Sequence, residues 1–196
     1  MGIKEEEMKT KQEYLEIMSN DLDVSFLEDA PEKFVRQFYI DYDLCKRLNF
    51  VPIVKGDYVL LKHMLGFSVV NLKKALEAAK REERFKTFLN SLKKGDTVRV
   101  HFLTTFEKDY TVKRVNRNSK GEVSSVTVDK NWKITIDDIA FEGSYGSEII
   151  SESRFWYVEI YNTAHSDYEL GLLLDKFPEI KEEFLNKNFD KTLNFD

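Results

Sequence analysis

The sequence predicts an α+β protein, in which a helical N-terminal region is joined by a long helix to a small antiparallel β-barrel. Short runs with alternating apolar residues, joined by tight turns, fill the stretch from Lys94 to Phe141. Four strands in so short a stretch leave no room for parallel crossovers. On both sides of it, apolar residues recur every three to four positions, as in helices. The predicted parts are a helical region over 1–92 with a bridging helix over 68–92, a barrel over 94–142, and a strand with C-terminal helices over 147–196.

The barrel is predicted from residues that alternate between a buried and a wet face. Val98 and Val100 alternate with Arg99 and His101, which predicts a first strand. In the next run, from 108 to 115, the alternation fails near its end, so we expect a β-bulge near Lys113 and Arg114. A turn rich in Asn, Ser and Gly over 116–121 then leads to a third strand over 122–129.

The last part of this stretch suggests how the barrel closes. Trp132, Ile134 and Ile136 recur on one face, which favours a core position for Trp132 over a position that stacks on nucleic-acid bases. A polar corner at Asp137–Asp138 precedes a short closing strand over Ile139–Phe141. This order of strands, with Lys-Gly-Asp at its start, resembles the SH3-like and Sm-like small barrels, including Tudor and KOW domains. The resemblance covers about a quarter of the chain and implies a barrel that binds peptides, nucleic acid or its own neighbours.

The N-terminal region is expected to be helical. Helical spacing predicts helices over 4–18 and Phe34–Leu48, and Gly56-Asp57 is expected to cap a short helix over Tyr58–Leu65 that Gly66 ends. With the bridging helix that follows from Ser68, this arrangement is similar to a helix-turn-helix. Two helices that simply pack together are the simpler interpretation, because Lys62 occupies a position where that motif needs a small residue.

The apolar stripe of the long bridging helix changes sides near Glu82–Glu83. Leu72 and Leu76 share one face, whereas Phe85 and Leu89 lie nearly opposite. Neither Gly nor Pro interrupts the helix, so we expect one rod whose two halves pack against different bodies.

Three features are expected in the C-terminal part. Arg154–Tyr161 is apolar on nearly both faces, which predicts a covered strand. Ser166 and Glu169 form a capping box before one helix, and Pro178 begins the last helix.

The charge of the chain is unevenly distributed. The formal net charge is −5 at pH 7, but residues 1–31 carry −6, residues 32–136 carry +10 and residues 137–196 carry −9. A basic middle attracts polyanions even when the net charge is negative. One cysteine cannot form an internal disulfide, and neither a membrane span nor a signal peptide is present, so we expect a cytoplasmic protein.

Catalytic motifs are scarce. Three histidines and one cysteine offer no metal-ligand spacing, and the chain has no glycine-rich phosphate loop. Cys45 lies among aromatic residues, where a buried thiol is expected. We therefore expect a protein that is not an enzyme and holds no cofactor or metal. An enzyme that uses His101 or His165 with a nearby carboxylate remains an alternative.

The leading hypothesis is a binding or regulatory protein that engages DNA or RNA, or a nucleic-acid-binding protein complex, through its basic middle. Cations interleaved with Tyr110 and Trp132 suit phosphates and unstacked bases. On the long helix, the alternative is a solvated face partly balanced by Glu77. The candidate nucleic-acid-binding residues are Lys73, Lys74, Lys80, Arg81, Arg84, Arg99, Lys113, Arg114 and Arg117.

The alternative hypothesis is a protein–protein interaction inhibitor, of the kind that phages and mobile elements encode for anti-defence or host takeover. Its acidic surfaces would occupy a basic groove on the partner. The candidate partner-binding residues are Asp167, Glu169, Glu179, Glu182 and Glu183.

Overall fold

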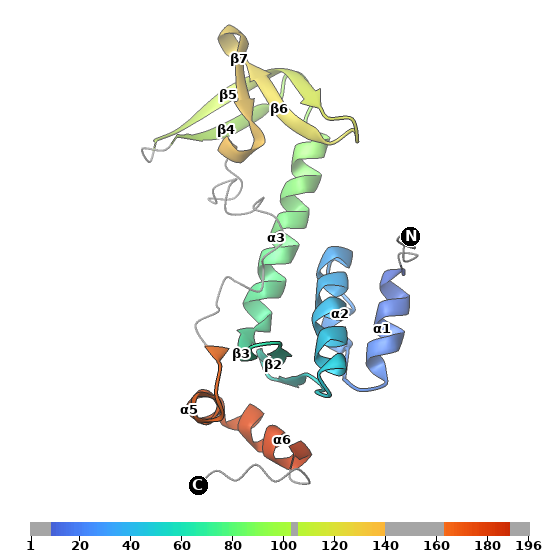
Figure 1. Ribbon diagram of the computed structural model, residues 1–196. Coiled ribbons are helices and arrows are strands. Elements are labelled where there is room, and N and C mark those ends of the chain that lie inside the picture. Colours follow the sequence, from blue (N-terminus) through green and yellow to red (C-terminus); the bar gives the residue numbers. More distant parts are fainter. Residues whose placement is uncertain (1–8, 103–105, 140–162, 189–196) are drawn as a thin grey trace, which may run out of the picture. The chain divides into compact units, whose positions relative to one another are not determined.

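The computed structural model describes residues 9–102, 106–139 and 163–188 (Figure 1). The chain divides into two compact units: unit 1 comprises residues 1–79 and 155–196, and unit 2 comprises residues 80–154. The described elements include five α-helices and two four-stranded antiparallel sheets, so the α+β class is confirmed. None of the helices in the described ranges has the length and apolar character needed to cross a membrane. The predicted strand over Arg154–Tyr161 lies outside the described residues.

Unit 1 consists of one sheet and the helices that pack with it. The strand order is β1-β2-β3-β8, and every neighbouring pair is antiparallel. Its strands are β1 (Ile53–Lys55), β2 (Tyr58–His63), β3 (Gly66–Asn71) and β8 (Thr163–Ala164). Its helices are α1 (Lys11–Ser19), α2 (Glu32–Arg47), α5 (Asp167–Asp175) and α6 (Pro178–Asn188), with the one-turn helix η1 (Ser25–Leu27). As expected, α6 begins at Pro178 and Ser166 caps α5.

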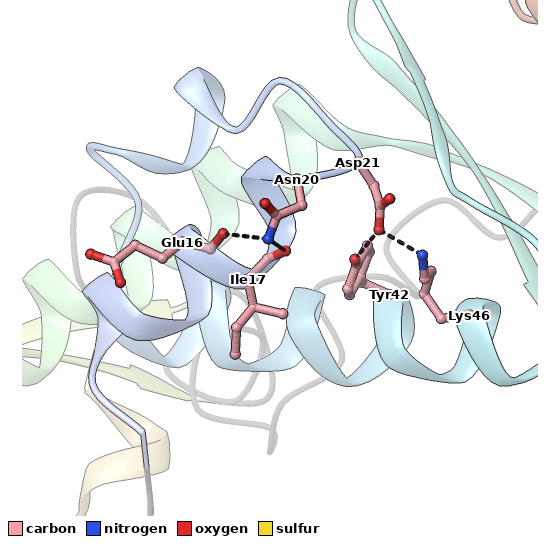
Figure 2. Close-up of polar contacts among 6 residues, drawn as sticks. All are labelled: Glu16, Ile17, Asn20, Asp21, Tyr42 and Lys46. Atoms are coloured by element: carbon pink, nitrogen blue, oxygen red, sulfur yellow. Dashed lines mark hydrogen bonds and ion pairs between the residues drawn. The ribbon is translucent and has the colours of Figure 1, made fainter.

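Polar contacts hold the end of α1 against α2 (Figure 2). The Asn20 side-chain amide donates to the carbonyls of Glu16 and Ile17 and closes the last turn of α1. Asp21 then accepts hydrogen bonds from the Tyr42 hydroxyl and, at 2.7 Å, from Lys46 Nζ. These two donors hold the pKa of Asp21 below its usual value, with Lys46 the larger cause. At the other end of this pair, Lys11 Nζ of α1 donates to the carbonyls of Glu28 and Ala30, directly before α2. The first turns of α2 are also held by Phe34, Val35 and Phe38, which are completely buried.

The predicted helix over Tyr58–Leu65 and the predicted start of the long helix at Ser68 are wrong, and so is the helix-turn-helix that they would form. The two segments are the paired strands β2 and β3, in register from Tyr58 opposite Asn71 to His63 opposite Gly66. In each strand three consecutive residues are buried, Val59 to Leu61 and Ser68 to Val70, so both faces are covered there. Such a run has no period-two alternation and is easily mistaken for a buried helix. The long helix α3 consequently begins at Leu72, where the Asn71 side chain accepts from Lys74 N, rather than at Ser68.

Unit 2 contains the second sheet, a curled half-barrel with the order β4-β5-β6-β7 (Figure 1). Its strands are β4 (Thr97–Phe102), β5 (Phe106–Arg117), β6 (Val123–Val128) and β7 (Trp132–Thr135), and two one-turn helices, η2 (Asp129–Asn131) and η3 (Ile136–Asp138), follow β6 and β7. The register shifts between Val112 and Arg114, which confirms the predicted bulge. After the corner at η3, Ile139 bridges back to Val100 in the first strand.

Helix α3 (Leu72–Ser91) contributes to both cores. Leu72, Ala75 and Ala79 are buried with the core of unit 1, whereas Phe85 and Leu89 are buried with the core of unit 2. The change of side in the apolar stripe is therefore a change of core, and the helix continues without a break. In unit 2, the buried valines of the curled sheet pack in one core with Phe85 and Leu89.

Candidate nucleic-acid interface

Trp132 is not the core residue that the sequence predicts, because 46% of its surface is exposed. It does lie on the same face of β7 as Ile134, which is buried. Trp132 is, however, the first residue of that strand, directly after the η2 turn. Alternation therefore identifies the face correctly, but the position in the edge strand β7 leaves Trp132 partly exposed.

The register of the sheet explains why a cleft opens beside this ring. Val112 in β5 pairs with Val128, the last residue of β6. Tyr110 lies two residues before Val112 in β5. Opposite Tyr110, β6 has ended at Val128 and the chain continues into the η2 turn. Trp132 from β7 contacts the Tyr110 ring at this position. The two ring centroids are 5.6 Å apart with an interplanar angle of 81°, an edge-to-face pair.

We call this site the Trp132 cleft. Its volume is about 640 Å³, within the range of small-ligand sites. It is lined by Lys108, Asp109, Tyr110, Asp129, Asn131 and Trp132. A cleft with an exposed indole and a half-buried phenol offers flat apolar surface beside charged groups, the combination on which nucleobases stack.

The Trp132 cleft is lined by one cation, Lys108, and by two carboxylates, each of which has a cationic partner outside the lining. Lys108 Nζ is 5.4 Å from the centroid of the Tyr110 ring, a cation–π contact. Arg99 Nε donates to Asp109 Oδ1 at 2.9 Å and holds the pKa of Asp109 below its usual value. Lys113 Nζ is 3.7 Å from Asp129 Oδ1, too long for a good hydrogen bond. Among these five side chains, lining residues and ion-pair partners together, the cations exceed the carboxylates by one.

Asn131 gives the cleft a neutral polar group. Its backbone has a φ of 58°, a left-handed conformation that Asn tolerates better than most residues. This conformation ends the η2 turn and directs the chain into β7. The side-chain amide at the cleft can both donate and accept hydrogen bonds.

The other predicted basic residues of the barrel have different surroundings. Arg117 donates to the carbonyls of Gly121 and of Asn90 in α3, so its guanidinium connects the sheet to the helix. Arg114 pairs across the sheet with Thr127, on the face opposite the core valines, and is exposed. Of the predicted barrel residues, Arg99 and Lys113 are thus the two that adjoin the Trp132 cleft.

The predicted basic residues of α3 lie on both sides of the division between the units. Lys73 and Lys74 belong to unit 1, and Lys80, Arg81 and Arg84 belong to unit 2. Lys73, Lys74 and Arg84 are exposed, whereas Lys80 and Arg81 are half-buried. They remain candidates for contact with a polyanion.

The predicted acidic residues are divided between structural contacts and solvent. Glu169 Oε2 accepts from His165 N, and Glu183 forms ion pairs with Lys55 and Lys187. These two carboxylates therefore stabilise unit 1. The others, Asp167, Glu179 and Glu182, are exposed.

Reactive side chains in unit 1 are buried or engaged. Ser68 Oγ and His63 Nε2 are 2.7 Å apart, a contact that the helical prediction for this segment could not anticipate. Ser68 is only 5% exposed and burial lowers the pKa of His63, so this pair is a hydrogen bond of the sheet interior. The His165 ring lies 3.1 Å from the Leu65 carbonyl. Cys45 is fully buried, as expected, and burial raises its pKa to about 11.

Sequence reasoning missed Lys108, Asp109, Asp129 and Asn131 as candidate site residues. Lys108 could have been found by extending the β5 alternation backwards, since it shares a face with Tyr110. Asn131 follows Lys130 in a short turn, but only the register of β5 against β6 shows that the turn borders a cleft.

Comparison with protein-family models, with curated proteins and with solved structures finds no match to this chain. Within the described ranges, no three cysteine, histidine or carboxylate side chains gather closely enough to hold a metal ion.

Proposed function

We propose that unit 2 binds nucleic acid through the Trp132 cleft and the cations beside it. The observation that carries the proposal is the exposed Trp132 ring, packed edge-to-face on Tyr110 with Lys108 over the same phenol. Exposed aromatic surface next to cations binds polynucleotides without requiring a deep pocket. An intracellular location and a small SH3-like barrel form part of this proposal, the second supported by the Val100–Ile139 bridge.

The ion pairs at the cleft do not prevent phosphate binding. Arg99, Asp109, Lys113 and Asp129 all have side chains that are more than half exposed. Exposed ion pairs contribute little to stability, because water already screens them. A phosphate can therefore replace a carboxylate as the partner of Lys113 at small cost, and counterions released from the polynucleotide favour the exchange.

The test is fluorescence anisotropy with labelled single-stranded and duplex DNA and RNA, titrated with salt. The double variant Lys108→Glu/Lys113→Glu is compared with Lys120→Glu. Lys120 is exposed and belongs to the same unit, but lies beyond the far end of β5, roughly 30 Å along the strand from Lys108. We expect salt-sensitive binding that the double variant weakens at least about tenfold and Lys120→Glu leaves nearly unchanged.

The salt dependence gives a second readout. For single strands, each phosphate contact contributes about 0.7 to the magnitude of the slope of log K against log salt concentration. The slope of the double variant, which lacks two lysine contacts, should therefore be smaller in magnitude by about 1.4. Absence of binding at low salt would reject the proposed function, and equal losses in both variants would move the contact away from the cleft.

A second candidate function, binding to a protein, is favoured by exposed apolar side chains in unit 1. Met64 and Leu65 at the β2–β3 turn are 76% and 78% exposed, and Tyr168 and Leu172 on α5 are 76% and 49% exposed. The His165–Leu65 contact ties this turn to the start of α5. Residues 163–175 contain acidic residues but neither Lys nor Arg, so the matching partner is a protein surface that is apolar with basic surroundings.

This candidate is tested by isothermal titration with a synthetic amphipathic Leu/Lys peptide. The double variant Leu65→Ser/Leu172→Ser should lose binding. Leu76→Ser is the control and should retain it, because Leu76 belongs to the same unit but packs against its core. Absence of binding to the unmodified protein would reject this candidate.

A further inference from the structure

We infer that the Trp132 cleft takes a single unpaired base, with a preference for cytosine over uracil or thymine. This inference rests on the proposed function and specifies its ligand. The accessible aromatic surface is one indole ring, 46% exposed, on one side of an edge-to-face pair. In a duplex, both faces of each base are occupied by stacked neighbours, so only an unpaired base can stack on such a ring.

Asp129 and Asn131 line the same cleft as Trp132, so a base stacked on the ring lies beside their polar groups. Asp129 is an acceptor, and its Oδ1 lies 3.7 Å from Lys113 Nζ. Asn131 adds one acceptor and one donor group. Base pairing would occupy the atoms of the base with which these groups form hydrogen bonds, a second reason for a single-stranded ligand.

The choice of base follows from hydrogen-bond chemistry. A carboxylate accepts hydrogen bonds and cannot donate them at neutral pH. Cytosine presents an amino group at C4, whereas thymine and uracil present a carbonyl oxygen at that position. The Asp129 carboxylate matches the amino group and repels the carbonyl oxygen, and Asp109, which also lines the cleft, adds negative charge that works in the same direction.

The position of the cations agrees with this ligand. The phosphates of a base stacked on Trp132 lie within a nucleotide's length of the ring. Lys108 lies over the Tyr110 ring that Trp132 contacts, and Lys113 is the ion-pair partner of Asp129 in the cleft. The Asn131 turn holds the site open, since its left-handed backbone at φ 58° directs the chain sharply from η2 into β7. The four elements of the site are thus a stacking surface, an acceptor, an amide and two phosphate-directed lysines.

The experiment uses the full chain with Trp156→Phe, so that Trp132 is its one tryptophan. Twelve-residue oligonucleotides of cytosine, uracil and thymine, as RNA and DNA, and a duplex are titrated while Trp132 fluorescence and anisotropy are recorded. We expect strong quenching by the cytosine strands, about fivefold to tenfold tighter binding than uracil or thymine strands, and no quenching by the duplex. The RNA and DNA arms identify which sugar the site accepts.

Two matched variants separate stacking from base readout. Trp132→Phe keeps an aromatic ring and should retain most affinity, whereas Trp132→Ala should lose about tenfold with an unchanged far-UV circular dichroism spectrum. Asp129→Asn should reduce the cytosine preference to less than twofold, and Asp137→Asn, an exposed carboxylate at the η3 corner, should preserve it. Loss of folding in Trp132→Ala would leave Trp132→Phe and the quenching data to decide.

The outcomes distinguish this inference from the proposed function. Salt-sensitive binding without quenching, or equal affinity for duplex and single strands, would overturn the inference and leave the proposed function standing. Quenching without a cytosine preference would overturn the base readout. No binding to any oligonucleotide would overturn both.

Discussion

The most quantitative prediction concerns Asp41, a half-buried carboxyl on α2. Burial raises its pKa from 3.8 to about 6, although the Gln37 amide donates to it at 3.4 Å and opposes the shift. A difference of this size between the folded and unfolded chain corresponds to about 3 kcal/mol. The ionised Asp41 is therefore a cost to the folded state above pH 6.

Replacing Asp41 by Asn removes the charge and keeps an acceptor for Gln37. The folded-state pKa lies above the unfolded value, so the native chain binds the extra proton between about pH 4 and 6 and loses it above that window. We expect Asp41→Asn to raise the free energy of unfolding by about 2 kcal/mol at pH 7.5, somewhat below the limit because water reaches the carboxyl. The gain should shrink as the pH falls through 6 and vanish near pH 4.

The measurement is urea unfolding followed by far-UV circular dichroism at several pH values from 4 to 8. Asp29→Asn is the control, since Asp29 is exposed and the substitution should change stability by less than about 0.5 kcal/mol. A gain that is equal at pH 4 and pH 8 would show that charge is not its source. A loss of stability at pH 7.5 would show that the carboxylate makes a contact that the folded state needs.

Two further predictions concern the cores and turns. Gly66→Ala should destabilise unit 1 by more than about 2 kcal/mol, because a Cβ there would lie 1.9 Å from the Ala164 carbonyl oxygen and φ is +150°. Gly121→Ala is the control. This position has open space around it, and the substitution should cost only about 1 kcal/mol. Thermal unfolding compares the pair, and similar losses would mean that the β3–β8 pairing can shift. Phe85→Ala should cost about 3–5 kcal/mol, because its side chain is fully buried in the core of unit 2. The free energy of unfolding is measured from Trp132 fluorescence during urea unfolding, in the Trp156→Phe background. A loss of unfolding free energy below about 1 kcal/mol would contradict the assignment of α3 to that core.

Local patterns predicted most of unit 2. Alternation in β4 and β7 identified the buried faces, and the failed alternation before Val115 located the bulge that the register shift after Val112 shows. The pattern could not place Trp132 along its strand, because exposure there depends on where β6 ends, a property of pairing between strands. The cleft therefore follows from register rather than from periodicity.

The error in unit 1 has a different physical origin. In the run from Tyr58 to Asn71, consecutive residues are buried in the middle of each strand, so the apolar residues do not alternate. Their spacing therefore fits a helix as well as a strand. The β-branched Val59, Val69 and Val70 favour strands, and Gly66 with φ +150° marks a hairpin end rather than a helix end. Weighing β-branched residues above spacing would have found the hairpin.

The central claim is that nucleic acid contacts this protein at the Trp132 cleft. An NMR titration of the 15N-labelled protein with an unlabelled single-stranded cytosine oligonucleotide tests it most directly, because each amide and the indole N–H report separately. The account predicts that the Trp132 indole signal and the amides of residues 108–110 and 129–132 shift first and most, and that α5 is unchanged. Shifts confined to α3 or to α5, or no shifts at low salt, would contradict it.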